Sequence, residues 1–266
     1  MNSCSIEKLT DLGSHPNQKV IAFCGAGGKT SSIHAIRDYY LAKNKKVLVT
    51  TTTHMLLEEG CLSNLNDIVE KLDNQGYAFA GIPMITDKAC VKTIFDDKVS
   101  IQTMYANKAG FHMSSSSSAR DQLIKSLQKD KISAIPNDVR FLAETHADVT
   151  LIEADGARCL PFKVPRTWEP VIPEETTDIV LVMGMDAEGK RICDICYNPE
   201  GVAEVMGVSI ETILTREMMI RAYMETYVPH IRKNFTSSRL FLYMNDKIPG
   251  KTIVNCGLFD RRLFLL

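Results

Sequence analysis

The sequence predicts a three-layer α/β fold, in which helices cover a mostly parallel β-sheet. The prediction rests on three apolar segments, residues 20–24, 47–49 and 149–152, each of which is typical of a buried strand. A helical pattern that begins at Ser31 separates the first two segments. A strand, a connecting helix and a second strand form a β-α-β unit, and its crossover requires the two strands to be parallel.

The first strand ends in a glycine-rich loop of the kind that binds phosphate. Backbone N–H groups of such a P-loop point at phosphate oxygens, and the positive end of the following helix favours the anion. The position of the first glycine of the full Walker A pattern holds Phe23, so a tight glycine turn of another α/β domain is the alternative. The predicted nucleotide-binding residues are Gly25, Ala26, Gly27, Gly28, Lys29, Thr30 and Ser31.

The strand at residues 149–152 is followed by two carboxylates, Glu153 and Asp155, which strand alternation would place on one face. Acids at the carboxyl edge of a sheet, beside a P-loop, can hold Mg²⁺, because this hard ion prefers oxygen ligands. We therefore predict Thr30, Glu153 and Asp155 as metal ligands, and Lys29, Glu153 and Asp155 as catalytic residues. The alternative is a strand edge with solvated acids.

Two further segments carry predicted substrate contacts. Four threonines and a histidine end the strand at residues 47–49, where ligands bind in open α/β sheets, although threonine is also simply a good strand former. A proline-rich connection at residues 158–173 is expected to lie over the same edge, with Lys163 as a second cation. The predicted substrate-contacting residues are Thr52, Thr53, His54, Arg158, Lys163 and Glu169.

The rest of the chain is expected to complete a single P-loop NTPase-like domain, residues 1–266, with a variable, irregular insert at about 84–135. A hairpin is expected over residues 90–105, a mobile serine-rich loop at 114–118 and a helix at 121–127. A helix at 210–227 would be capped by Ser209 or Thr215, whose hydroxyls can accept a hydrogen bond from its first turn.

Composition excludes several classes of partner. The 266 residues carry a net charge of −1, so neither nucleic acid nor a membrane surface is a predicted partner. Eight scattered cysteines and an N-terminus without signal-peptide features favour a reducing, cytoplasmic location. Only Cys193 and Cys196 have CxxC spacing; a structural role is favoured over a metal-binding or redox role because no second CxxC exists.

Taken together, the motifs resemble the selenium-dependent hydroxylase accessory proteins, the YqeC-type family of selenium cofactor biosynthesis. The resemblance covers residues 19–55 and 148–190. It implies a P-loop NTPase-like protein that helps to mature molybdenum hydroxylases with a labile selenium cofactor, and it names a molybdenum hydroxylase or a selenium donor protein as partners. The motifs that carry it are Gly25-Ala26-Gly27-Gly28-Lys29-Thr30, Thr50-Thr51-Thr52-Thr53-His54-Met55, Glu153-Ala154-Asp155-Gly156-Ala157 and Glu169-Pro170-Val171-Ile172-Pro173.

The leading functional prediction is Mg²⁺-dependent binding and hydrolysis of a nucleoside triphosphate, ATP or GTP, or transfer of its phosphate. Two alternatives stay open. A nucleotidyltransferase acting on a molybdopterin-type cofactor would also begin with a strand followed by Ala26-Gly27-Gly28. A nucleotide-gated chaperone with little turnover would use the long insert as its moving part.

Overall fold

The structure is a computed structural model that describes residues 19–84, 92–93, 100–101, 131–248, 251–253 and 256–258. Its main element is an eight-stranded sheet with the strand order β12-β11-β10-β1-β9-β2-β4, in which β13 also pairs with β11. The strands of this sheet are β1 (Lys19–Ala26), β2 (Val47–Thr51), β4 (Tyr77–Phe79), β9 (Val149–Glu153), β10 (Asp178–Gly184), β11 (Arg239–Ile248), β12 (Lys251–Ile253) and β13 (Cys256–Leu258).

From β11 to β4, each neighbouring pair of strands is parallel, and only β12 and β13 run antiparallel to β11. Strands β2, β9 and β10 are buried along their whole length, as expected for a parallel sheet with helices on both faces. The predicted fold class, a three-layer α/β fold with a mostly parallel sheet, is confirmed.

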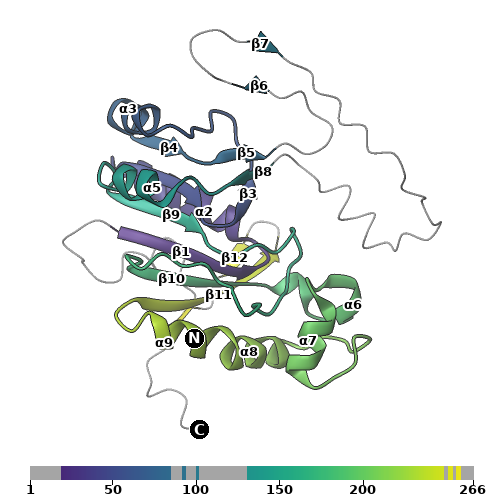
Figure 1. The fold of residues 1–266 in the computed structure, drawn as a ribbon. Helices are drawn as coiled ribbons and strands as arrows, with labels where there is room; N and C mark the ends of the chain where they lie inside the picture. The colour runs from purple at the N-terminus through teal and green to yellow at the C-terminus, as the bar shows by residue number, and fades with distance from the viewer. Residues whose placement is uncertain are drawn as a thin grey trace.

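Helices lie on both faces of the sheet (Figure 1). On one face, Ile33 and Ile36 of α2 pack against Phe23 and Val49. The alternating residues of the same strands point to the other face, where α3 and α5 cover Leu48 and α7 to α9 complete a larger core. The helices are α2 (Lys29–Leu41), α3 (Leu65–Gln75), α5 (Asn137–Glu144), α6 (Ile192–Ile195), α7 (Pro199–Met206), α8 (Arg216–Glu225) and α9 (Tyr227–Asn234), with a 3₁₀ turn at Met185–Ala187.

A small antiparallel sheet lies beside the carboxyl end of β2. Its strands are β3 (His54–Leu56), β8 (Lys131–Ser133) and β5 (Ile82–Met84), with β8 in the centre. Within the expected hairpin at residues 90–105, β6 (Lys92–Thr93) and β7 (Ser100–Ile101) pair antiparallel, as predicted. The predicted serine-rich loop at 114–118 and the predicted helix at 121–127 lie outside the described residues.

Helix α8 begins six residues later than the pattern suggested. Its N-cap is Thr215, whose hydroxyl oxygen accepts a hydrogen bond from the N–H of Met218 at 3.3 Å. The second of the two predicted caps is therefore the one used, because residues 210–214 form a turn and an isolated bridge between Arg191 and Ile213 instead of a helical turn.

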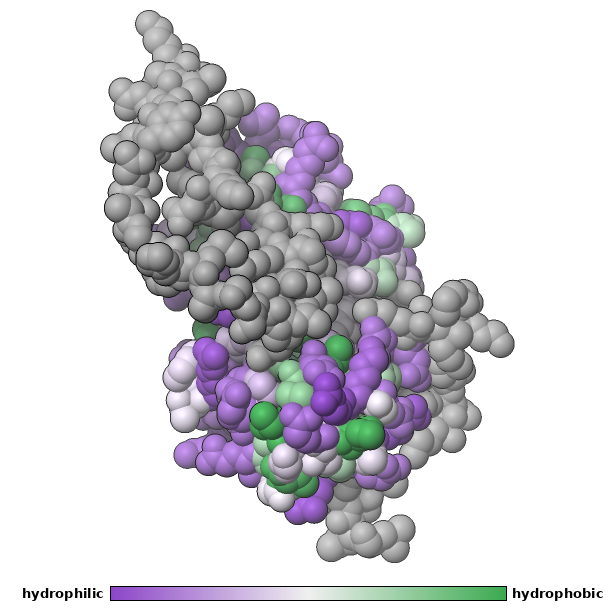
Figure 2. Space-filling view, turned by 90° about the vertical axis from the view of Figure 1, so that its right-hand side faces the viewer, coloured by the Kyte–Doolittle hydropathy of each residue, from purple (hydrophilic) through white to green (hydrophobic). Residues whose placement is uncertain are grey.

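The side of the molecule that carries α6 and α7 shows hydrophobic side chains scattered among hydrophilic ones (Figure 2). Isolated exposed apolar residues are normal on protein surfaces. Among the helices that the structure describes, none has both the length and the apolar composition that crossing a bilayer requires.

Candidate functional site

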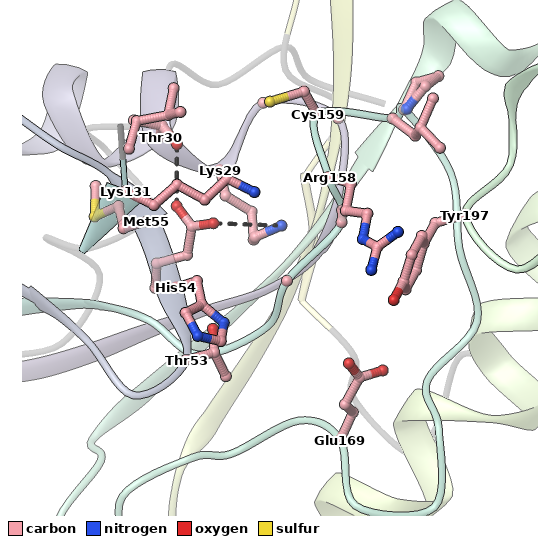
Figure 3. Close-up of a pocket in the computed structure, with 18 of the residues that line it drawn as sticks. Lys29, Thr30, Thr53, His54, Met55, Lys131, Arg158, Cys159, Glu169 and Tyr197 are labelled. Atoms are coloured by element: carbon pink, nitrogen blue, oxygen red, sulfur yellow. Dashed lines mark hydrogen bonds and ion pairs between the residues drawn. The ribbon is translucent and has the colours of Figure 1, made fainter. Parts of the chain in front are cut away.

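The glycine-rich loop lies at the carboxyl edge of the sheet, where β1 is flanked by β9 and β10. This neighbourhood follows from the strand order and places Glu153, the last residue of β9, beside the start of α2. The loop borders a cleft of about 1110 Å³ (Figure 3). The predicted site residues that line this cleft are Gly27, Gly28, Lys29, Thr30, Ser31, Thr52, Thr53, His54, Glu153, Arg158 and Glu169.

Two glycines of the loop are required by its backbone and its close packing. Gly25 and Gly27 have φ angles of 86° and 80°, a region that favours glycine. A Cβ on Gly27 would lie 2.4 Å from the Cα of Gly184 on the neighbouring strand β10. Substitution would therefore displace the loop from the sheet edge, because a backbone atom cannot move aside as a flexible side chain can.

The start of α2 is suited to binding an anion. Gly28 is the N-cap and provides no side-chain cap, and the first turn contains no acidic residue. The N–H groups of Lys29, Thr30 and Ser31 consequently have no intrahelical partner, and the helix dipole adds partial positive charge there. This turn borders the cleft, so a phosphate or carboxylate could accept its N–H groups.

Lys29, Thr30 and Glu153 converge at this helix start. The ammonium of Lys29 donates to the carbonyl of Gly25 at 2.8 Å and lies 3.8 Å from the Glu153 carboxylate. The Thr30 hydroxyl donates to the other oxygen of Glu153 at 3.0 Å. Burial raises the pKa of Glu153, although Lys29, the Thr30 hydroxyl and Lys131 oppose that shift. The group combines a cation, a hydroxyl and a carboxylate with remaining lone pairs.

Asp155 lies in a different environment. Strand β9 ends at Glu153, so the alternation that would have placed both acids on one face does not extend to Asp155. One oxygen of Asp155 accepts from the N–H of Gly25 at 3.1 Å and from the hydroxyl of Tyr227 at 2.5 Å. The other forms a 2.5 Å ion pair with Lys163. Burial, followed by the negative charge of Asp155, raises the pKa of Tyr227 well above its ordinary value, so its hydroxyl stays a donor.

Asp155 and Lys163 are fully buried and do not line the cleft, and neither do Gly25 and Ala26. Lys163 was expected to contact substrate. Its ammonium instead donates to the Gly156 carbonyl at 3.0 Å and pairs with Glu169 at 2.6 Å. Lys163 thereby ties the connection after β9 to the base of the glycine loop.

The threonines in the segment at the end of β2 differ in whether their hydroxyls bond to the protein or are available to a ligand. Thr50, Thr51 and Thr52 donate to the backbone carbonyls of Ala80, Glu153 and Val171 at 2.9, 2.7 and 2.6 Å, and so join β2 to its neighbours. The buried hydroxyl of Thr53 has no partner in the described part of the chain, and His54 is exposed on the cleft wall. Thr53 and His54 are therefore the members of this segment that remain available to a ligand.

The cleft also contains residues to which the sequence assigned no role: Lys131, Arg166, Trp168 and Tyr197. Lys131 lies within the expected insert and belongs to none of the motifs found in the sequence, so no signal pointed to it. Arg166 and Trp168 belong to the connection that is expected to cover the site. An arginine close to an aromatic residue in that connection was the sequence signal that could have identified them. Tyr197 lies between Cys196 and Pro199-Glu200, far along the chain.

The CxxC cysteines do not share one environment. Cys196 is buried in the core beneath α8, whereas the thiol of Cys193 lies 3.5 Å from the carboxylate of Asp194 near the surface. In the part of the chain that the structure describes, no group of three or more His, Cys, Asp or Glu side chains is arranged to hold a metal ion. The favoured structural interpretation of this motif stays a prediction.

The fold and the cleft define an α/β protein with a glycine-rich loop at the edge of a mostly parallel sheet. The YqeC protein family model matches residues 21–200, and the chain belongs to this family. It is 28% identical over 184 residues to a protein of Escherichia coli K12 named "Uncharacterized protein YqeC"; the match covers 69% of this chain and 59% of that relative. No solved structure matches the chain.

Proposed function

We propose that the cleft binds a nucleoside triphosphate with Mg²⁺ and hydrolyses it, or transfers its terminal phosphate, during the maturation of selenium-dependent molybdenum hydroxylases. The observation that carries the proposal is the convergence of the uncapped helix start with Lys29, Thr30 and Glu153 at one end of a large cleft. The part played in hydroxylase maturation rests on the family resemblance.

The chain's own residues would act mainly by positioning and by balancing charge, which is what phosphoryl transfer requires of a protein. The backbone N–H groups at the start of α2 would hold phosphate oxygens. Lys29 is almost completely buried, so its charge is little weakened by water, and it would stabilise the charge that develops on the leaving phosphate. Thr53 and His54, on another wall of the cleft, would contact the phosphate acceptor.

The donor set at the helix start fits Mg²⁺. This ion prefers oxygen ligands and is commonly held by one or two protein oxygens together with substrate phosphates. The Thr30 hydroxyl and the Glu153 carboxylate, 3.0 Å apart, would hold the ion, which supplies positive charge beside the phosphates when bound. Asp155 was also expected to be a ligand, but its oxygens are already engaged, so we assign the metal role to Glu153.

Thermal denaturation with ATP, GTP and their non-hydrolysable analogues tests the binding step. A ligand at a hundred times its Kd stabilises the folded state by about 2.7 kcal/mol. For a protein of this length, such a gain raises the Tm by roughly 5–10 °C. One of the two nucleotides with Mg²⁺ should therefore produce a clear shift, and the absence of a shift with both at millimolar concentration would contradict the proposal.

The Lys29→Ala variant tests the chemical step. Removing a group that stabilises charge in the transition state lowers the rate by about 100-fold or more, while the fold should persist, as a cooperative thermal transition would show. Lys233→Ala, which removes an exposed lysine of α9, is the matched control and should keep full activity. Assays for both phosphate and pyrophosphate separate the reactions, because a nucleotidyltransferase would release pyrophosphate.

A further inference from the structure

Arg158 and Tyr197 lie together on the side of the cleft away from Lys29 and Thr30 (Figure 3), and Arg166 and Trp168 also line the cleft. The guanidinium carbons of Arg158 and Arg166 lie 5.5 and 4.9 Å from the centre of the Tyr197 ring. That of Arg166 also lies 5.5 Å from the centre of the Trp168 ring, and Trp168 is 65% exposed. We name these four residues the arginine stack.

The charges of the two arginines are held in place without being neutralised. Within the described residues, neither Arg158 nor Arg166 forms an ion pair with a carboxylate. The carboxylate of Glu169, in the same connection, is already engaged, because it pairs with Lys163 at 2.6 Å and accepts from the backbone N–H of Arg166 at 3.0 Å. Stacking on a ring orients a guanidinium but leaves its N–H groups free for an anion.

The backbone that presents the stack is strained. Arg158 and Cys159 have φ angles of 48° and 61°, and Asn198, which follows Tyr197, has a φ of 55°. For Arg158 and Cys159 the left-handed conformation costs about 1–2 kcal/mol per residue, whereas asparagine adopts it more readily. Such conformations persist where the surrounding structure fixes them, and they gather at functional sites. The N–H of Tyr197 donates to the carbonyl of Phe162 at 2.9 Å, which fixes the ring against the same connection.

We propose that the arginine stack is a second anion subsite, which binds the phosphate or carboxylate group of a second substrate across the cleft from the glycine loop. The two guanidiniums offer paired N–H donors that match either anion. The role of this anion as phosphate acceptor rests on the proposed function, but binding at the stack does not require that function. The subsite restricts the acceptor to anionic molecules.

Fluorescence of Trp168 provides a direct test, because it is the only tryptophan of the chain and belongs to the stack. Inorganic phosphate and pyrophosphate are titrated into the full-length protein at constant ionic strength. We expect a saturable change in emission. In the separate variants Arg158→Gln and Arg166→Gln, the affinity should fall about tenfold or more, since each loses hydrogen bonds to a charged group.

Two further variants locate the anion. Arg221→Gln removes an exposed arginine of α8 and should bind as the wild type does. Lys29→Ala removes the cation of the glycine loop but leaves the arginine stack intact, so phosphate should still change the emission of Trp168. Binding at the stack can therefore be tested even if the proposed nucleotide site is wrong. The inference is overturned if both arginine variants keep wild-type affinity, if Lys29→Ala abolishes the change, or if neither fluorescence nor calorimetry detects saturable binding to the wild type.

Discussion

Glu153 and Asp155 are separated by one residue, yet they belong to two different parts of the molecule. Glu153 faces the α2 side of the sheet, accepts one hydrogen bond from Thr30 and borders the cleft. Asp155 lies in the layer of α8 and α9, where Lys163, Tyr227 and the N–H of Gly25 occupy both of its oxygens. Glu153 therefore has more unused lone pairs, beside the start of α2, whereas both oxygens of Asp155 are engaged by donors.

We expect this difference to separate a functional role of Glu153 from a structural role of Asp155. A carboxylate that already satisfies a buried cation and two further donors holds its surroundings together, and Asp155 joins the glycine loop, the connection after β9 and α9. A buried carboxylate whose pKa is raised costs stability when it is charged, and such groups gather at functional sites. Substitution of each acid should therefore affect different properties.

The largest effect on stability is expected for Asp155→Asn. The substitution leaves Lys163 buried with only Glu169 as a charged partner, and breaking a buried ion pair costs about 3–5 kcal/mol. Urea denaturation measures this loss. Asp194→Asn is the control, because it breaks an exposed ion pair with Arg191 and should change the free energy of unfolding by less than about 1 kcal/mol. Equal losses in the two variants would contradict the structural role of Asp155.

Glu153→Gln is expected to show the opposite pattern. Because the folded state raises the pKa of Glu153, it binds this proton more tightly than the unfolded state does, and wild-type stability falls as the pH rises through the raised pKa. The variant lacks this fall, so at neutral pH it should be at least as stable as the wild type. Nucleotide hydrolysis should drop by about 100-fold or more. A loss of stability as large as that of Asp155→Asn would remove the distinction between the two acids.

A third buried carboxylate, Glu144 on α5, gives the smallest expected effect and lies outside the cleft lining. Burial raises its pKa to about 7, against the opposing influence of Arg140. Wild-type stability should therefore fall between the ordinary pKa of a glutamate and pH 7, and then level off. Relative to the wild type, Glu144→Gln should gain roughly 5–10 °C in Tm between pH 5 and pH 8, with hydrolysis unchanged. If the difference in Tm between Glu144→Gln and the wild type stayed constant from pH 5 to pH 8, the raised pKa of Glu144 would be contradicted.

The elements that could be predicted from sequence are those with local signals. Buried strands, the glycine loop and the hydroxyl cap at Thr215 each depend on residues close together in the chain. The orientation of Asp155 could not be predicted, because it depends on β9 ending at Glu153 and on Tyr227, 72 positions further along. Lys163 suggested a substrate contact by its charge, and only the tertiary structure shows that two acids enclose it.

The arginine stack was also only partly predictable from the sequence. Arg158 was predicted as a substrate contact from its place after β9, but its ring partner Tyr197 comes from a segment 39 positions away, before α7. Lys131 enters the cleft on β8, a strand that no sequence pattern indicated. Contacts between loops depend on how the sheet brings the ends of its strands together, and this order is set by long-range packing.

Calorimetric titration of a non-hydrolysable ATP or GTP analogue, with and without Mg²⁺, tests the central claim most directly when the wild type is compared with Glu153→Gln. The account predicts that the wild type binds one nucleotide per chain and that Mg²⁺ tightens this binding. In Glu153→Gln the tightening by Mg²⁺ should be lost while the protein remains folded. Failure of the wild type to bind either analogue, or an unchanged effect of Mg²⁺ in the variant, would contradict the assignment of this cleft as a Mg²⁺–nucleotide site.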